Sequence, residues 1–255
     1  MPGLRAGQDA AHFTYGQDQS VGLGLLNGSA RGRVGHAAPA VSPDGVPLGV
    51  LSRQLWGNMD TPVPGYKLQM DPEIVRCASA RWAVTLAGIQ EALPAGQAAL
   101  VLADRESDVT GYRRAPRRPG IEPLLRAVGG RKVNGAVREA DPLHTERGVL
   151  AEVVAQAPGF GLHTVAVPAQ PARPGCAGQS ARLASLEIRV AAVRLPVVAA
   201  TQQRQEQPVA PRWTILAVDP EPPAGTSSLC WRLLTTLAVA DPKAALAMIA
   251  LSTQR

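Results

Sequence analysis

The stretch VLADRESD (101–108) joins an apolar run to a group of acidic residues. Residues 97–104 form a short run of apolar and small side chains that ends on Asp104, as expected of a strand buried on both faces of a sheet. In α/β sheets, ligands and ions bind outside the carboxyl ends of the strands. The stretch therefore predicts an α/β sheet that presents Asp104 at a functional edge.

Helix and strand signals lie on both sides of this run. Upstream, Asp71 is placed as an N-cap with Pro72 at the first helical position, and Pro94 ends the helix. Downstream, residues 121–130 predict another strand. The alternation of strand, helix and strand indicates a sheet with flanking helices.

A hairpin is predicted near the start of the chain. The turn sequence SPDG (42–45) separates the apolar runs 34–41 and 46–56. Pro43 presets φ for the turn, and Gly45 can adopt the positive φ that a tight turn requires. The sheet should therefore contain antiparallel strands as well as the buried run.

Three sections follow from these patterns. Residues 1–130 form the first part of an α/β core, and 131–230 alternate polar and apolar residues with period two between Pro-rich links, as in an antiparallel β section. Residues 231–255 return to the α/β pattern, with a strand over 233–239 and a helix capped by Asp241. The expected fold class is α/β, with a mixed sheet, flanking helices and an inserted antiparallel β section.

Composition narrows the classes of function. The net charge of +6 comes mostly from arginines, which cluster at 111–120 and 129–139 and suit a polyanionic partner or, alternatively, a solvated basic face. The three cysteines are far apart and the four histidines lack paired spacing, which argues against zinc sites and disulfides. The first residues contain no apolar leader, and no run is long enough for a membrane span. We expect a cytoplasmic protein.

The carboxylates are the candidate catalytic groups. Asp9 follows a short segment at the start of the chain, and with Asp104 on an adjacent strand it could share a divalent cation, Mg²⁺ or Mn²⁺. Both aspartates could instead cap turns. We expect Arg105, Glu106 and Asp108 to orient Asp104 without all binding the cation themselves. Alternatively, the two acids complement the dipole of a following helix.

The order of these motifs resembles the DDE transposases of bacterial insertion sequences, in the cut-and-paste group with a Y-x2-R-x3-E-x6-K signature. The resemblance covers nearly the whole chain. It rests on QDAAHFTY (8–15), VGHAAPAVSPDGVPLGVLSRQLW (34–56), CASARW (77–82), VLADRESDV (101–109), PLLRAVGGRKV (123–133) and CWRLLTTLAV (230–239). The DGVPLG and ADRESD blocks are the most specific of these.

The resemblance implies an RNase H-like core with a β insertion and a role for individual residues. Asp9 and Asp104 become the first two catalytic carboxylates, each binding Mg²⁺ or Mn²⁺. The implied partner is double-stranded DNA at transposon ends, bound by a homodimer in a synaptic complex in the nucleoid. Its DNA contacts would be Arg126, Arg131, Trp231 and Arg255, with the tryptophan stacking near a flipped base.

Departures from the family pattern limit the expected activity. The threonines after the first aspartate are Ala10 and Ala11, and Ser252 stands at the signature tyrosine. The signature glutamate would fall four residues after Arg255, so the third carboxylate is absent, and the chain resembles a fragment truncated at both ends. We expect no strand transfer by this chain alone.

Two other functions remain open on the sequence. The chain could be a non-catalytic remnant that binds DNA or intact transposase subunits. It could also be a metal-dependent RNase H-like nuclease, if Glu106 or Asp108 replaced the missing acid.

Overall fold

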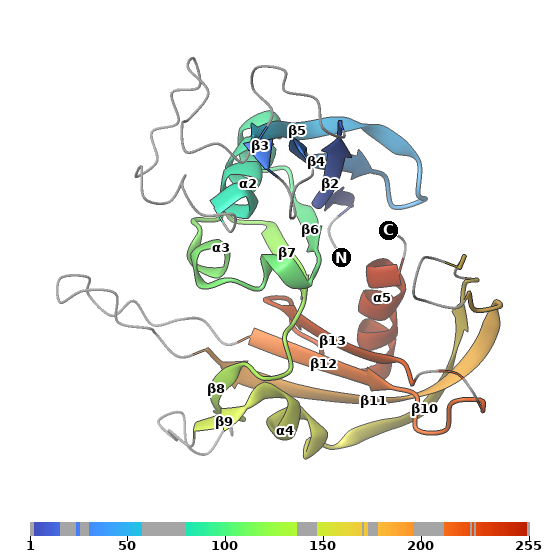
Figure 1. Cartoon of the computed structure of the whole chain (residues 1–255). Coiled ribbons are helices and arrows are strands. Elements are labelled where there is room, and N and C mark those ends of the chain that lie inside the picture. Colours follow the sequence, from blue (N-terminus) through green and yellow to red (C-terminus); the bar gives the residue numbers. More distant parts are fainter. Residues whose placement is uncertain are drawn as a thin grey trace. The chain divides into compact units, whose positions relative to one another are not determined.

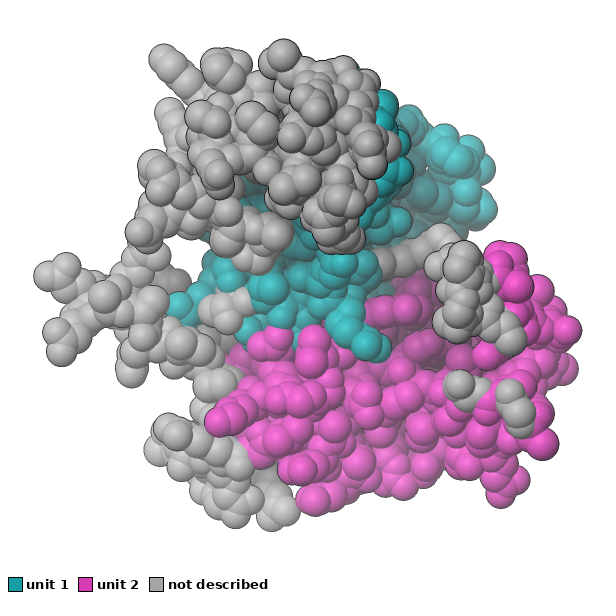
Figure 2. All heavy atoms as spheres, in the orientation of Figure 1, with its two compact units in different colours: residues 1–125 teal, residues 126–255 magenta. Residues whose placement is uncertain are grey.

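The computed structural model divides into two compact units, Met1–Leu125 and Arg126–Arg255, coloured separately in Figure 2. Each is described by itself. The structure describes residues 3–15, 24–25, 31–57, 80–136, 147–169, 171–172, 178–195, 212–224, 226 and 228–253. Within these ranges, no helix is long and apolar enough to cross a membrane.

Unit 1 is built on a mixed sheet. Its main strands are β1 (Leu4–Gly7), β2 (Asp9–Thr14), β4 (Arg31–Val41), β5 (Pro47–Gly57), β6 (Ala99–Ala103) and β7 (Ile121–Arg126), with a short β3 (Gly24–Leu25) paired to β4. Strand β4 runs antiparallel to β5 on one side and to β1 and β2 on the other. Strand β1 is parallel to β6, and β6 is parallel to β7. The predicted α/β class with a mixed sheet is confirmed (Figure 1).

The predicted hairpin is present as β4 and β5. Gly45 in the turn has φ of +86°, the left-handed conformation that favours glycine, as its place in SPDG predicts. The amide of Gly45 donates to the carbonyl of Ser42, which closes the turn. The strand predicted from the apolar run is β6, and all of its residues are buried.

The core of unit 1 lies between one face of the sheet and helix α2 (Ala80–Ala92). Trp82, Leu86 and Ile89 of α2 pack with Ala6 of β1 and Val101 of β6. The predicted start of this helix at Asp71 lies outside the described residues. After β6 come a 3₁₀ turn, η1 (Arg105–Ser107), and the short helix α3 (Thr110–Arg114).

Unit 2 is an antiparallel sheet with a helix on each face. The strands are β8 (Lys132–Ala136), β9 (Arg147–Val149), β10 (Gly159–Val167), β11 (Arg182–Arg194), β12 (Arg212–Val218) and β13 (Cys230–Thr235). Helix α4 (Leu150–Ala155) packs its buried residues against one face of β11 and β12. Helix α5 (Pro242–Thr253) contacts β11 from the opposite face (Figure 1).

The helix predicted after Asp241 is confirmed, because Asp241 Oδ1 accepts a hydrogen bond from the amide of Ala244 at 2.7 Å. The strand predicted over 233–239 was placed too late, since β13 begins at Cys230 and ends at Thr235. There the Thr235 hydroxyl accepts a hydrogen bond from the amide of Leu237 at 3.2 Å. This local bond takes the place of a further backbone hydrogen bond to β12.

The predicted sections map onto the two units as follows. The change expected near residue 131 falls a few residues after the division between Leu125 and Arg126. The section 131–230 supplies β8 to β12, and β13 of the section 231–255 pairs antiparallel with β12. Strand β13 thus lies in the same sheet as the predicted antiparallel section.

Candidate metal and active site

The two candidate carboxylates lie at the ends of adjacent parallel strands. Strands β1 and β6 pair from Leu4 with Ala99 to Gly7 with Leu102, and the amide of Gln8 donates to the carbonyl of Leu102 at 2.8 Å. Asp9 and Asp104 follow two residues beyond the last pair of this ladder, where Asp9 begins β2 and pairs with Ala37 of β4. The parallel ladder therefore brings the acidic ends of both strands to one edge of the unit 1 sheet.

Each carboxylate also makes a local backbone contact. Asp9 is exposed, and its Oδ1 accepts from the amide of Ala10 at 2.8 Å. Asp104 is half-buried and caps η1, with its Oδ1 accepting from the amide of Glu106 at 2.8 Å. A carboxylate has two oxygens and about four lone-pair sites, more than one such backbone contact uses. The turn-capping and metal-binding roles are compatible.

The donor set fits a hard divalent cation only in part. Two aspartate carboxylates are the oxygen ligands that Mg²⁺ and Mn²⁺ take, usually with several waters. Among the residues that the structure describes, no group of three or more His, Cys, Asp or Glu side chains could hold a metal ion. The described site thus supplies two carboxylates.

The acids that follow Asp104 point in different directions. Glu106 forms an ion pair with Arg81 of α2, with an N–O distance of 2.8 Å and a glutamate side chain that is 62% exposed. Asp108 is buried and lies 3.5 Å from the Nε of Arg113 in α3. Arg105 is exposed on η1. The carboxylate of Asp104 accepts a hydrogen bond from the backbone amide of Glu106 rather than from the side chain of either acid.

His36, for which the sequence predicts no functional role, lies in the core of unit 1. It is fully buried on β4, its Nδ1 lies 2.6 Å from the Thr85 hydroxyl, and its ring meets Trp82 edge-on at 4.4 Å. Burial and, to a lesser extent, the positive charge of Arg81 lower the pKa of His36 to about 4, against the opposing influence of Asp9. His36 is therefore neutral at physiological pH, as a hydrogen-bonded core residue.

The arginines of 111–120 stabilise the fold of unit 1. Arg117 donates to the carbonyls of Tyr112, Arg113 and Ala115, and its guanidinium lies 5.0 Å from the centre of the Tyr112 ring. Arg118 donates to the carbonyls of Leu93 and Pro94 at the end of α2. Arg117 and Arg118 therefore bind backbone carbonyls of unit 1. The segment is neither a merely solvated face nor a surface on which every arginine is available to a polyanion.

Three predicted DNA contacts lie near one another in unit 2. The amide of Ala127, next to Arg126, donates to the carbonyl of Arg232, next to Trp231, at 2.7 Å. The amide of Arg131 closes the following turn by donating to Val128. Trp231 is half-buried on β13, and the predicted contact Arg255 lies outside the described residues.

Arg232, which the sequence did not single out, lies close to the predicted contacts Arg126 and Arg131. A Cβ on Gly129 would lie 3.2 Å from the guanidinium carbon of Arg232, so this guanidinium lies against the backbone of the 127–131 turn. The detectable signal was the arginine between apolar residues in CWRLL (230–234).

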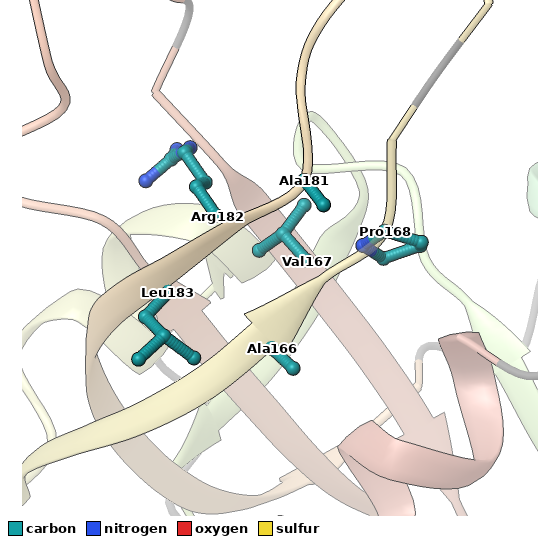
Figure 3. A pocket seen from close by; sticks show the side chains of 6 residues that line it. All are labelled: Ala166, Val167, Pro168, Ala181, Arg182 and Leu183. Atoms are coloured by element: carbon teal, nitrogen blue, oxygen red, sulfur yellow. The ribbon is translucent and has the colours of Figure 1, made fainter.

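A groove opens beside the ends of β10 and β11 (Figure 3). Its volume is about 560 Å³, and it is lined by Ala166, Val167, Pro168, Ala181, Arg182 and Leu183. Arg182, its one charged side chain, forms an ion pair with Asp219 at 2.7 Å. None of the predicted site residues lines this groove, and its surface lacks the acids and bases of a catalytic centre.

Comparison with known proteins adds no family to this description. A scan against protein-family models finds no match, and no curated protein matches the sequence.

Proposed function

We propose that the chain carries an RNase H-like core of the DDE transposase type, in which Asp9 and Asp104 bind a divalent cation next to DNA. The observation that supports the proposal is the parallel pairing of β1 and β6, whose last pair, Gly7 and Leu102, is followed two residues later by Asp9 and Asp104. Two carboxylates at the carboxyl ends of neighbouring strands form the kind of site that phosphoryl transfer by metal ions uses.

The sheet of unit 1 supports the same proposal. Its strands follow the order β5, β4, β1, β6 and β7, with antiparallel pairing up to β1 and parallel pairing beyond it. This mixed arrangement is compatible with an RNase H-like core. The antiparallel sheet of unit 2 corresponds in sequence to the β insertion that the family resemblance implies.

The roles proposed for the residues follow from their positions. Asp9 and Asp104 hold Mg²⁺ or Mn²⁺, and the amide of Glu106 keeps one oxygen of Asp104 in place. When bound, such a cation supplies Lewis acidity to a phosphodiester and activates a water or a 3′ hydroxyl. Arg126, Arg131 and Trp231 of unit 2, with the addition of Arg232, contact DNA phosphates and bases.

Two carboxylates favour binding over catalysis. A site with two protein ligands holds its cation loosely and orients it poorly, so we propose that the chain alone does not transfer strands. This observation favours the second candidate function, a non-catalytic DNA- or transposase-binding remnant. The nuclease alternative is less well supported, because Asp108 is buried beside Arg113 and Glu106 is paired with Arg81.

Cleavage and joining of transposon-end DNA test the catalytic part of the proposal. Purified protein is incubated with Mg²⁺ or Mn²⁺ and the DNA, and we expect no cut or joined product. Activity that disappears in Asp104→Ala would show that the chain is a working enzyme and would contradict the remnant assignment.

DNA binding provides a separate test. Affinity for duplex DNA should be largely independent of sequence and should fall steeply between 50 and 200 mM salt, by about tenfold or more for a few phosphate contacts. Arg131→Gln should weaken this binding and reduce the salt slope, whereas Arg118→Gln, which removes a contact to α2, serves as the matched control of charge. Affinity that does not change with salt would exclude a phosphate-binding surface.

A further inference from the structure

Gln8, the residue immediately before Asp9, is fully buried. Its backbone amide donates to the carbonyl of Leu102 on β6, and its side-chain Nε2 donates to the hydroxyl of Tyr112 at 3.1 Å. Reversing the side-chain amide would exchange donor and acceptor but keep a hydrogen bond to this hydroxyl. Strand β6 thus holds the backbone of Gln8, and helix α3 holds its side chain.

Tyr112 is itself held firmly. It is fully buried on α3, its ring meets Trp82 of α2 at 6.2 Å in an edge-on geometry, and the guanidinium of Arg117 lies 5.0 Å from the ring centre. Aromatic and cation–π contacts of this kind fix the plane of a ring. The Tyr112 hydroxyl therefore has a defined position against which Gln8 can be placed.

The segment that carries Tyr112 begins at the second candidate carboxylate. The hydroxyl of Ser107 donates to the carbonyl of Asp104 at 2.6 Å, and buried Asp108 pairs with Arg113 of α3. These contacts fold residues 105–114 back onto the sheet. The chain that leaves Asp104 thus returns, through Tyr112, to the residue next to Asp9.

We infer that Tyr112 is a positioning residue that sets the spacing of Asp9 and Asp104 through its hydrogen bond to Gln8. The inference rests on the proposed function, because it assigns this spacing a role in binding the cation. The register of β1 and β6 ends at Gly7 and Leu102, and Asp9 then pairs with Ala37 of β4, so beyond the Gln8 amide the β1–β6 ladder does not tie Asp9 to Asp104. The Gln8 side chain supplies a further constraint at this point.

Tyr112→Phe is the direct test, since it removes the hydroxyl and keeps the ring that packs against Trp82 and Arg117. Mn²⁺ affinity is measured by electron paramagnetic resonance on the full chain. Loss of an interaction that orients a metal ligand typically weakens metal binding by about tenfold or more, and we expect about tenfold for Tyr112→Phe.

A structural effect is separated from a positioning effect by two further variants. Thr235→Val removes another buried hydroxyl that makes one hydrogen bond, in unit 2, and should leave Mn²⁺ affinity unchanged. Gln8→Met keeps the length of the side chain and should match the loss in Tyr112→Phe. The double variant should then lose no more than either single variant, because both remove the same bond.

Each outcome decides the inference. Equal and non-additive losses in Tyr112→Phe and Gln8→Met, with Thr235→Val unaffected, support it. If wild type binds Mn²⁺, Asp104→Ala abolishes binding and Tyr112→Phe leaves it intact, the inference is overturned while the proposed function stands. If wild type shows no Mn²⁺ binding that depends on Asp9 and Asp104, the metal site of the proposed function and the inference are both overturned.

Discussion

The two units place their polar side chains in different ways. In unit 1, buried polar groups connect elements far apart in the chain: Gln8 and Tyr112 are 104 residues apart, and His36 and Thr85 are 49 apart. In unit 2, ion pairs join residues that are closer in the chain, as in Arg189 with Glu187 on one strand and Arg182 with Asp219, 37 residues apart. Parallel strands have no hairpin to fix their ends, so long-range side-chain bonds can define an edge there. This difference makes the edge of unit 1 the better candidate for chemistry.

The largest effects should come from the cores, and they test whether the units are separate. Trp82 in unit 1 and Leu186 in unit 2 are both buried, with at most 1% of their surface exposed. Trp82→Ala should cost about 3–5 kcal/mol and Leu186→Ala about 2–5 kcal/mol of unfolding free energy. Urea denaturation followed by circular dichroism should show each variant shifting a different transition. A single transition shifted by both would mean that the units unfold together.

The next largest effect should be a pH dependence specific to unit 1. The pKa of His36 is about 4 in the folded protein and about 6.5 in the unfolded chain, so the unfolded chain binds more protons between these values. Stability from the neutral imidazole is therefore complete above pH 6.5 and is lost as the pH falls toward 4. The loss should reach about 3 kcal/mol.

His36→Gln measures this contribution, because glutamine does not titrate. Urea unfolding of wild type and variant from pH 7.5 to 4 should show a difference that shrinks as the pH falls. The carboxylates that titrate below pH 5 are common to both proteins and largely cancel. A difference that stays constant over this range would mean that His36 titrates normally in the folded state.

Local signals in the sequence predicted most of the secondary structure. The turn at Gly45, the buried strand β6 and the cap at Asp241 each depend on residues within a few positions, and all three are present. The late placement of β13 arose because apolar residues continue past Thr235, where a side-chain bond ends the strand. The spacing of apolar residues in the sequence does not indicate such a hydrogen bond.

The sequence predicted the strand ends that carry Asp9 and Asp104 but not the side-chain hydrogen bonds around them. Asp9 and Asp104 could be placed at strand ends from the sequence, and each lies two residues beyond the last pair of the parallel β1–β6 ladder. The bond between Gln8 and Tyr112 depends on how α3 returns to the sheet, which no local pattern encodes. Likewise, Arg117 and Arg118 looked like a polyanion surface because charge is visible in a sequence and a carbonyl partner is not.

A smaller effect is expected from the buried ion pair of unit 2. Asp219 is 3% exposed and accepts from Arg182, whose side chain is 17% exposed. Asp219→Ala should cost about 2–3 kcal/mol, since the partly exposed arginine loses its partner but keeps some contact with water. Arg182→Met should cost more than Asp219→Ala, because it leaves the buried carboxylate of Asp219 without its cation. Thermal unfolding of the two variants provides the comparison, and equal values would mean that the burial of Asp219 adds nothing to the cost.

The smallest effect should be at the exposed ion pair of unit 1. Glu106 is 62% exposed, so Glu106→Gln should change the unfolding free energy by only about 0–1 kcal/mol. Arg81→Met breaks the same pair but also removes a positive charge that lowers the pKa of His36. Glu106→Gln should therefore leave the pKa of His36 unchanged or lower it, so stability is still lost from pH 6.5 down to 4 or below. Arg81→Met should raise the pKa of His36, which narrows the pH range over which stability is lost. If both variants gave the same pH profile, the charge of Arg81 would not reach the core, and the buried polar groups of unit 1 would be as local in their effects as those of unit 2.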